Sequence, residues 1–456
     1  MIGLLEKVNH FVWGVPALIL ILGVGIYLSI RTGFAQIILF PKALRAFVDK
    51  LFNKNSKENG VTSFQALCTA LAATVGTGNI VGVAGAITIG GPGAIFWMWI
   101  CGILGMVTKY AEAVLAVRYQ EKNAKGEIVG GPMYMIRRGL PPRCHWMAGL
   151  YSFFGVVAAF GVGNATQINA VIGGVNSVVT AFGGAESFAG NLFIGILLAI
   201  LITVLLLGGA KKIGVVAERL VPFAAVLYLI LGIGVLGVRR NYISSAFLSI
   251  FEGAFSPCSV TGGVLGSAFV ALRVGASRGV FTNEAGMGTA SIAHGSAKVK
   301  HPAEQGLMGI MEVFLDTIVI CTMTALVILS SGIEIPYGID MGGSLTSQAF
   351  SAIYGDWVCI PIALALCCFA VATVLGWGLY GARCAQYLFG EGVWRKFVFL
   401  QTATVIAGSV LNTGTVWVLS ETVNGLMAIP NLITVAWLSP ELIKITKQYK
   451  RKYENS

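Results

Sequence analysis

The stretch of residues 68–90, CTALAATVGTGNIVGVAGAITIG, constrains the fold of this chain more than any other. It is apolar and long enough to cross a bilayer. The residues at its middle are Gly76, Thr77, Gly78 and Asn79. Glycine weakens a helix and asparagine is costly in hydrocarbon, so the pattern predicts two half-helices joined by a short unwound segment. A continuous glycine-rich helix packed closely against its neighbours is the alternative.

An unwound segment at mid-membrane depth releases backbone N–H and C=O groups. These groups are tolerated only where they line a cavity or bind a ligand. The N-terminus of a half-helix favours a carboxylate, and released carbonyl groups favour a small cation.

The composition is that of an all-α polytopic membrane protein. Of 456 residues, 56% are hydrophobic and only 11% are charged, and the mean hydropathy is +0.80. The net charge of +11 does not indicate nucleic-acid binding, because the basic residues fall between hydrophobic spans instead of on one face. The nine cysteines include no CxxC pair and no Cys/His spacing suited to zinc, so we expect neither disulfides nor a transition metal.

The hydrophobic pattern predicts eleven transmembrane helices. They cover residues 12–30, 68–90, 94–117, 146–180, 191–207, 214–238, 262–294, 306–330, 357–380, 397–411 and 415–438. The segment 262–294 is expected to be a second broken helix. The residues that interrupt it are Arg273, Gly275, Ser277, Arg278, Gly279 and Asn283.

The order of the spans predicts an inverted repeat. Without the first helix ten spans remain, and the two broken ones are the first of each group of five, as in transporters whose discontinuous helices meet at the membrane midplane. The expected units are an N-terminal helix with a cytoplasmic loop (1–60), two five-helix repeats (61–240 and 241–440) and a cytoplasmic tail (441–456).

Lysine and arginine are concentrated in alternate loops. These loops are 31–60, 118–145, 208–213, 296–302, 381–396 and the tail after residue 439. The opposite loops 181–190, 332–343 and 412–414 contain none, and Arg239 and Arg240 are the exception. Because basic loops stay on the cytoplasmic side, we expect the N-terminus outside and the C-terminus inside.

Polar side chains within spans are candidates for a binding site. Asn79 could coordinate a cation or a ligand through its oxygen, or bridge two helices. Asn164 and Gln167 share a helix face, which indicates either helix–helix hydrogen bonds or a wet cavity. Thr373 could supply an oxygen to sodium, although a threonine in a membrane helix most often bonds its own backbone four residues back.

The acidic side chains within the predicted spans can have more than one role. Glu312 and Asp316, one turn apart, could form a cation path, but pairing with a basic residue such as Arg273 or Arg278 is the favoured interpretation. Glu284, in FTNEAGMG, has a role either in a gate or in helix capping. Catalytic or metal-binding constellations are lacking in the sequence, so an enzyme is not expected.

Five motifs resemble the alanine or glycine:cation symporter family, also called sodium:alanine symporters. They are GTGNIVGVAGAITIGGPGAIFWMW (76–99), GGPMYMI (130–136), GNATQIN (163–169), RGVFTNEAGMGTASIAH (278–294) and LGWGLYGARC (375–384). The resemblance implies a leucine-transporter-type fold with one additional N-terminal helix. It also implies import of alanine or glycine with Na+ by alternating access, across the cell (inner) membrane of a bacterium or archaeon.

The resemblance also implies roles for single residues, because VGTGN (75–79) is similar to the VGxGN pattern of bacterial sodium:amino acid symporters. The implied substrate-binding residues are Thr74, Gly76, Thr77, Gly78, Asn79 and Gln167. The implied sodium ligands are the carbonyls of Ala72 and Val75 and the hydroxyl of Thr373. Ala372 stands where the family often has a second hydroxyl residue, so the sodium shell is expected to be one side-chain oxygen short.

The sequence leaves an alternative open for both the coupling ion and the substrate. Some proton-coupled relatives of this fold carry a lysine on the fifth core helix, and the predicted helix 214–238 has none, which favours Na+. A proton-coupled or glutamine-preferring carrier remains the alternative of the same class. A channel is disfavoured, because polar residues occur only at isolated depths. The expected partners are the amino acid and the lipid bilayer, without nucleic acid.

Overall fold

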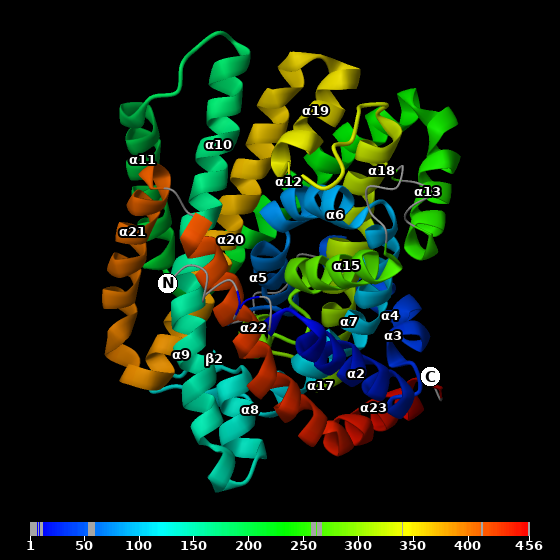
Figure 1. Cartoon of the computed structure of the whole chain (residues 1–456). Helices are drawn as coiled ribbons and strands as arrows, with labels where there is room; N and C mark the ends of the chain where they lie inside the picture. The colour runs from blue at the N-terminus through cyan, green and yellow to red at the C-terminus, as the bar shows by residue number, and fades with distance from the viewer. Residues whose placement is uncertain are drawn as a thin grey trace.

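The computed structural model describes residues 7, 9, 12–52, 60–256, 261, 267–339, 341–411 and 414–454, and nearly all of them are helical (Figure 1). The sheet within these residues is an antiparallel hairpin of β1 (Glu121–Lys122) and β2 (Ile128–Val129), in which Glu121 pairs with Val129. The predicted start of the seventh span at 262–266 and residues 412–413 of a predicted loop lie outside the described residues.

The helices follow one another along the chain with short connections. The N-terminal half contains α2 (Val15–Arg31), α3 (Ala35–Ile38), α4 (Phe40–Phe52), α5 (Ser63–Thr74), the π-helix η1 (Gly78–Gly82), α6 (Val83–Gly90), α7 (Gly93–Arg118), α8 (Pro132–Gly139), η2 (Pro142–Cys144), α9 (Trp146–Phe160), the π-helix η3 (Gly161–Ala165), α10 (Thr166–Ala181), α11 (Phe188–Leu206) and α12 (Gly209–Val238). The C-terminal half contains η4 (Arg240–Tyr242), α13 (Ile243–Phe255), α15 (Ala268–Asn283), α16 (Thr289–His294), α17 (Pro302–Val313), the π-helix η5 (Phe314–Cys321), α18 (Thr322–Ser330), α19 (Gly343–Tyr354), η6 (Asp356–Val358), α20 (Cys359–Phe389), η7 (Glu391–Val393), α21 (Trp394–Val410), α22 (Gly414–Trp437) and α23 (Ser439–Glu454).

Six helices in the described portion of the chain are long and apolar enough to cross a membrane, or up to eight if each bent pair is one span. The multi-pass helical class is therefore as expected, and the number of eleven spans stays a prediction. The span around α9 and α10 runs from 142 to 181, 40 residues, which agrees with the expected overlong fourth span. Its centre is the π-helix η3, which places the GVGNA sequence at mid-span.

The first predicted break is present. A capping box at Thr62 starts α5, the helix ends at Thr74, and Val75 has an extended backbone with ψ 103°. Helical structure resumes in η1, and the halves Ser63–Thr74 and Gly78–Gly90 are bent by 51°. The interrupted hydrophobic run therefore folds as two half-helices.

The second break lies later than predicted. Helix α15 runs without interruption through Arg273 and Gly279, so the expectation that these residues break it is wrong. Asn283, also named, is its last residue, and the segment is broken there as predicted. A single glycine costs a helix only about 1 kcal/mol relative to alanine, which packing offsets. The chain leaves the helix at Glu284, where φ is 52°, and continues through Gly286 and Gly288 at φ 95° and 78°, a region that favours glycine.

The two broken helices pack on one another. Helix α15 packs against α6, and α16 packs against α5, so each half of one helix contacts one half of the other. The long helix α7 packs against α15 and α17, and α20 packs against α5 and α9. Figure 1 shows α5, α6, α15 and α7 near the centre of the bundle, with α10, α11 and α21 together at one side. This arrangement brings both breaks to the interior.

Candidate functional site

A small cavity borders the first break. Its volume is about 20 Å³, and it is lined by Ala73, Thr74, Gly76, Thr77, Gly78, Val162, Gln167, Phe281, Glu284, Thr373 and Trp377. A volume of this size holds about one water molecule. The conformation is therefore closed, and the lining elements must separate before any larger ligand can enter.

The cavity brings together all the predicted substrate-binding residues except Asn79, and it adds Thr373 from the predicted sodium site. Thr77 donates its hydroxyl to Gln167 Oε1 at 3.2 Å, and Gln167 Nε2 donates to the Val162 carbonyl at 3.1 Å. The Val162 carbonyl belongs to η3, so this π-helix positions the amide of Gln167. The neighbouring candidate Asn164 instead donates to the Gln401 carbonyl, which makes it a helix–helix contact.

The backbone at the first break does not use the hydrogen bonds of a continuous helix. The Gly76 N–H donates to Asn79 Oδ1 at 2.9 Å, and the Asn79 N–H donates to the Gly76 carbonyl. In a continuous α-helix these two N–H groups would go to the carbonyls of Ala72 and Val75. Those two buried carbonyls, the predicted sodium ligands, therefore lack their helical donors.

Thr373 lies directly against the break. A Cβ atom added at Gly76 would meet Thr373 Oγ1 at 2.8 Å. The Thr373 hydroxyl donates to the Phe369 carbonyl at 3.0 Å, as a membrane threonine commonly does. Its oxygen lone pairs can still accept or ligate, because only the proton is used in that bond.

Asn79 joins the first break to the second through a chain of hydrogen bonds. Its Nδ2 donates to Asp316 Oδ1 at 2.7 Å, and Thr317 Oγ1 donates to Asp316 Oδ2 at 2.9 Å. Asn283 Nδ2 donates to Thr317 Oγ1 at 3.1 Å, and Asn283 Oδ1 accepts the Ala285 N–H at 2.9 Å. The two breaks are therefore connected through buried polar groups.

A buried lysine also contacts the second break. Lys109 Nζ lies 3.3 Å from Glu312 Oε1 and 3.9 Å from Glu112 Oε2, and it donates to the Glu284 carbonyl at 3.2 Å. His294 Nε2 lies 2.8 Å from Glu312 Oε2. All these side chains are fully buried or nearly so, and burial of charge is tolerated only with such partners.

The favoured pairing with a basic residue is confirmed for Glu312, although the partner is neither Arg273 nor Arg278, and it is wrong for Asp316. Glu312 pairs with Lys109 and His294, and Asp316 bonds to Asn79 and Thr317. Reasoning from the sequence missed Lys109, although its position with Glu112 in the middle of a hydrophobic span was a signal for a functional or paired charge.

Glu112 holds the second break in place. Its Oε1 accepts the N–H groups of Gly286 and Gly288 and the side-chain amide of Asn431. The two backbone groups lie at the N-terminal end of α16, where a carboxylate is favourable.

Glu284 lies between the break and the cavity. It is the C-cap residue of α15. Its carboxylate accepts hydrogen bonds from Trp377 Nε1 at 3.1 Å and from Thr289 Oγ1 at 2.6 Å. It therefore ends the helix and also lines the cavity. Among the described residues, no group of three or more His, Cys, Asp and Glu side chains is arranged to hold a metal ion.

Comparison with known proteins gives consistent matches. The model of the sodium:alanine symporter family matches residues 1–456. The sodium/alanine symporter AgcS of Methanococcus maripaludis is 42% identical, over 100% of this chain and 98% of the relative. The probable sodium/glutamine symporter GlnT of Bacillus subtilis is 34% identical, over 97% of this chain and 90% of the relative.

A solved structure has a similar fold. The crystal structure of MhsT in complex with L-phenylalanine matches with a TM-score of 0.57 and 16% identity, over 86% of this chain and 99% of that chain. At this identity the match shows the fold alone, which is the leucine-transporter-type fold that the sequence motifs implied.

Proposed function

This chain belongs to the sodium:alanine symporter family, and on that premise we propose that it imports alanine or glycine together with Na+ by alternating access. The family supports the broader function, cation-coupled amino acid symport by a multi-pass membrane protein that is not an enzyme. One observation carries the proposal. The unwound backbone at Gly76 meets Thr373 and Gln167 around a closed cavity inside the bundle.

The charges of the cavity match those of an amino acid. The helical N-terminus that follows the break, at Thr77 and Gly78, favours the substrate carboxylate. The C-terminal end of α15 and the Glu284 carboxylate, on the other wall, favour the ammonium group. In the open state, Asn79 completes the site by releasing the Gly76 N–H toward the substrate.

The preference for a small side chain rests on the walls of the cavity. Phe281 and Trp377 line it, and the Trp377 indole is held by its bond to Glu284. Alanine or glycine therefore fits with the least displacement. Because GlnT carries the name of a glutamine symporter, a glutamine-preferring carrier is the second candidate.

Sodium is the proposed coupling ion, bound by the carbonyls of Ala72 and Val75 and by the Thr373 hydroxyl. The two carbonyls lack their helical donors, and hard cations take oxygen ligands. Helix α12 starts at Gly209, earlier than predicted, and so includes Lys211 and Lys212. Both lysines are exposed in its first turn and do not line the cavity, so neither replaces a sodium ion there.

We further propose the membrane arrangement that the basic loops predict. The N-terminus lies outside, the C-terminus lies inside, and the site of insertion is the cell (inner) membrane. The proposed repeats are 61–240 and 241–440, following the N-terminal segment 1–60 and preceding the tail 441–456. Contacts of α15 with α6 and of α16 with α5 support the inverted relation.

Uptake by purified protein in liposomes tests this function. Radiolabelled L-alanine should accumulate under an inward Na+ gradient with no proton gradient, and unlabelled glycine should compete more strongly than glutamine. Accumulation under a proton gradient without Na+ would refute sodium coupling. Stronger competition by glutamine than by alanine would identify the second candidate as correct.

A further inference from the structure

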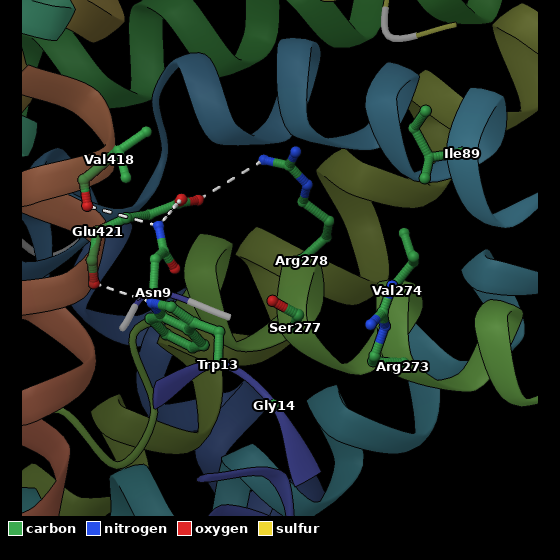
Figure 2. A pocket seen from close by; sticks show the side chains of 10 residues that line it. All are labelled: Asn9, Trp13, Gly14, Ile89, Arg273, Val274, Ser277, Arg278, Val418 and Glu421. Carbon is green, nitrogen blue, oxygen red and sulfur yellow. Dashed lines mark hydrogen bonds and ion pairs between the residues drawn. The ribbon is translucent and has the colours of Figure 1, made fainter. Parts of the chain in front are cut away.

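Two larger cavities with polar walls lie away from the central one. Figure 2 shows the first, of about 380 Å³, in which Arg278 of α15 and Glu421 of α22 point toward one another, with Nη1 and Oε1 3.9 Å apart. An internal ion pair thus crosses that cavity. The second, which we call the inner pocket, has a volume of about 460 Å³. It is lined by Lys125, Glu127, 207–210, Arg383, Gln386, 391–392 and 394–395.

The inner pocket lies where four predicted spans end. The spans 191–207, 214–238, 357–380 and 397–411 border the basic loops 208–213 and 381–396, and residues of both loops line the pocket. In the proposed orientation these loops are cytoplasmic, so the pocket lies at the depth of the lipid headgroups. Basic pockets between membrane helices at this depth bind lipid headgroups in other proteins.

A buried arginine forms one wall of the inner pocket. The side chain of Arg383 is only 4% exposed. Its Nη2 donates to Glu127 Oε2 and its Nη1 donates to Gln386 Oε1, both at 3.0 Å, and its Nε has no hydrogen-bond partner among the described residues. A guanidinium has five N–H donors, so these two bonds leave three of them without an acceptor in the described part of the chain.

Trp394 fixes the position of this arginine. The Arg383 Cζ atom lies 5.4 Å from the centroid of the Trp394 ring. Trp394 Nε1 donates to the Leu206 carbonyl at 3.2 Å, and Leu206 is the last residue of α11. Helix α12 begins three residues later, at Gly209. The Trp394 ring therefore connects the guanidinium to the chain that leads into α12.

The start of α12 supplies backbone donors to the same pocket. The helix is 30 residues long, and no side chain caps its N-terminus. Gly208, Gly209 and Ala210 line the pocket. The first N–H groups of a helix have no acceptor within it, and the aligned peptide dipoles place about half a positive charge there. Such a helix end binds anions.

The charges of the lining also favour an anion. The lining has three basic and two acidic side chains, which are Lys125, Arg383, Arg395, Glu127 and Glu391. Both carboxylates are already engaged, because Glu127 accepts the Arg383 bond and Glu391 Oε1 accepts the Ala124 N–H at 2.8 Å. The side chains therefore give a net charge of +1, to which the helix end adds.

We propose that the inner pocket binds a phosphate group. Phosphate oxygens accept hydrogen bonds from the Arg383 guanidinium and from the first N–H groups of α12, and Lys125 and Arg395 add attraction. The headgroup of an anionic lipid and free phosphate both carry this group, and the depth of the pocket favours the lipid. The bound group joins the start of α12 to the end of α20.

Thermal unfolding of the purified full chain in detergent tests the site, because a ligand that binds the folded protein raises the unfolding temperature. The probes are dioctanoyl phosphatidylglycerol, dioctanoylglycerol, which has the same acyl chains without phosphate, and inorganic phosphate. We expect phosphatidylglycerol to raise the unfolding temperature and dioctanoylglycerol to leave it unchanged. An equal rise with inorganic phosphate at the same concentration would support the site with free phosphate as its ligand, and a rise with the lipid alone would support it with the lipid.

Two substitutions of Gly392 separate charge from fold. Gly392 lines the pocket and nothing lies within 4 Å of a Cβ added there, so Gly392→Glu and its neutral control Gly392→Gln both have room. Gly392→Glu should raise the apparent Kd for phosphatidylglycerol about fivefold or more relative to Gly392→Gln. Arg395→Gln should raise it by a similar factor. Arg143→Gln, at an exposed position in a basic loop outside the pocket, should leave it unchanged.

Equal values of Kd in Gly392→Glu and Gly392→Gln, or an unchanged Kd in Arg395→Gln, would overturn the site. So would stabilisation by dioctanoylglycerol as large as that by phosphatidylglycerol, or no stabilisation by either phosphate-bearing probe. These measurements involve no alanine uptake, so their failure and the failure of the proposed function are separate results.

Discussion

The side-chain amide of Asn79 donates to Asp316 at 2.7 Å, which ties the start of η1, directly after the first break, to the π-helix η5. Asp316 is fully buried and forms no ion pair with any described residue. Its oxygens are satisfied by amide and hydroxyl donors instead. A buried carboxylate held in this way keeps Asn79 oriented, and Asn79 in turn holds the Gly76 N–H.

Removal of the Asp316 carboxylate should therefore impair transport. In Asp316→Ala both hydrogen bonds are lost and Asn79 is left with one partner fewer, so we expect alanine uptake to fall about tenfold or more. Asp316→Asn keeps the acceptor for Asn79 and should retain more activity. Exposed Asp356→Asn is the control. Equal, wild-type rates in both Asp316 variants would show that the connection between the breaks is not used.

Gln167 and Asn164 should differ although they are three residues apart. Gln167→Ala removes a cavity wall and the partner of Thr77, so the KM for alanine should rise without loss of membrane insertion. Asn164→Ala removes a hydrogen bond to the Gln401 carbonyl, so the free energy of unfolding should fall by about 1–3 kcal/mol. The KM for alanine should stay unchanged. Uptake kinetics and thermal unfolding in detergent distinguish them. Wild-type KM in Gln167→Ala would place the substrate elsewhere.

Asn79→Ala should reduce uptake for a different reason. The variant loses the acceptor that holds the Gly76 N–H and the donor to Asp316, so the geometry of the break changes. We expect lower alanine uptake in vesicles with normal insertion. Wild-type uptake by this variant would contradict a role for Asn79 in the site.

Substitution of Gly76 should act on the sodium site. In Gly76→Ala the new methyl group would lie 2.8 Å from Thr373 Oγ1, closer than a real contact, so the hydroxyl must move away from the break. The Na+ concentration for half-maximal uptake should rise by about tenfold or more, since one ligand is displaced. Gly173→Ala is the matched control, because nothing lies within 4 Å of the added atom. An unaltered Na+ dependence would argue against Thr373 as a ligand.

Loss of Lys109 should destabilise the protein. Lys109→Gln leaves Glu112 and Glu312 buried without their cation, and breaking a buried pair typically costs about 3–5 kcal/mol. The measurement is thermal unfolding of the purified protein. The double variant Lys109→Gln with Glu312→Gln should recover some of the loss. Arg118→Gln, which breaks a half-exposed pair with Glu441, should cost about 1 kcal/mol or less.

The first break could be predicted from the sequence because its cause is local. Glycines and an asparagine in the middle of a hydrophobic run disfavour a continuous helix. The second break could not be located in this way. Arg273 and Gly279 are tolerated within α15 by its packing, whereas the actual break depends on Gly286 and Gly288 and on a carboxylate from α7.

The partners of the buried charges were also beyond prediction. Asn79 and Asp316 are 237 residues apart, and Lys109 meets the Glu284 carbonyl 175 residues away. Such pairs depend on how the helices pack against one another. The spacing of residues within one span does not predict that packing. Thr373 and Gln167 could be assigned to one cavity only because a family resemblance supplied the three-dimensional arrangement.

The position of Glu112 has a consequence for movement. One of its oxygens receives two main-chain groups that precede α16 and the amide of Asn431 from α22. Glu112 thereby joins α7, α16 and α22 at a single point, so these three helices should move as one body in the proposed alternating-access cycle.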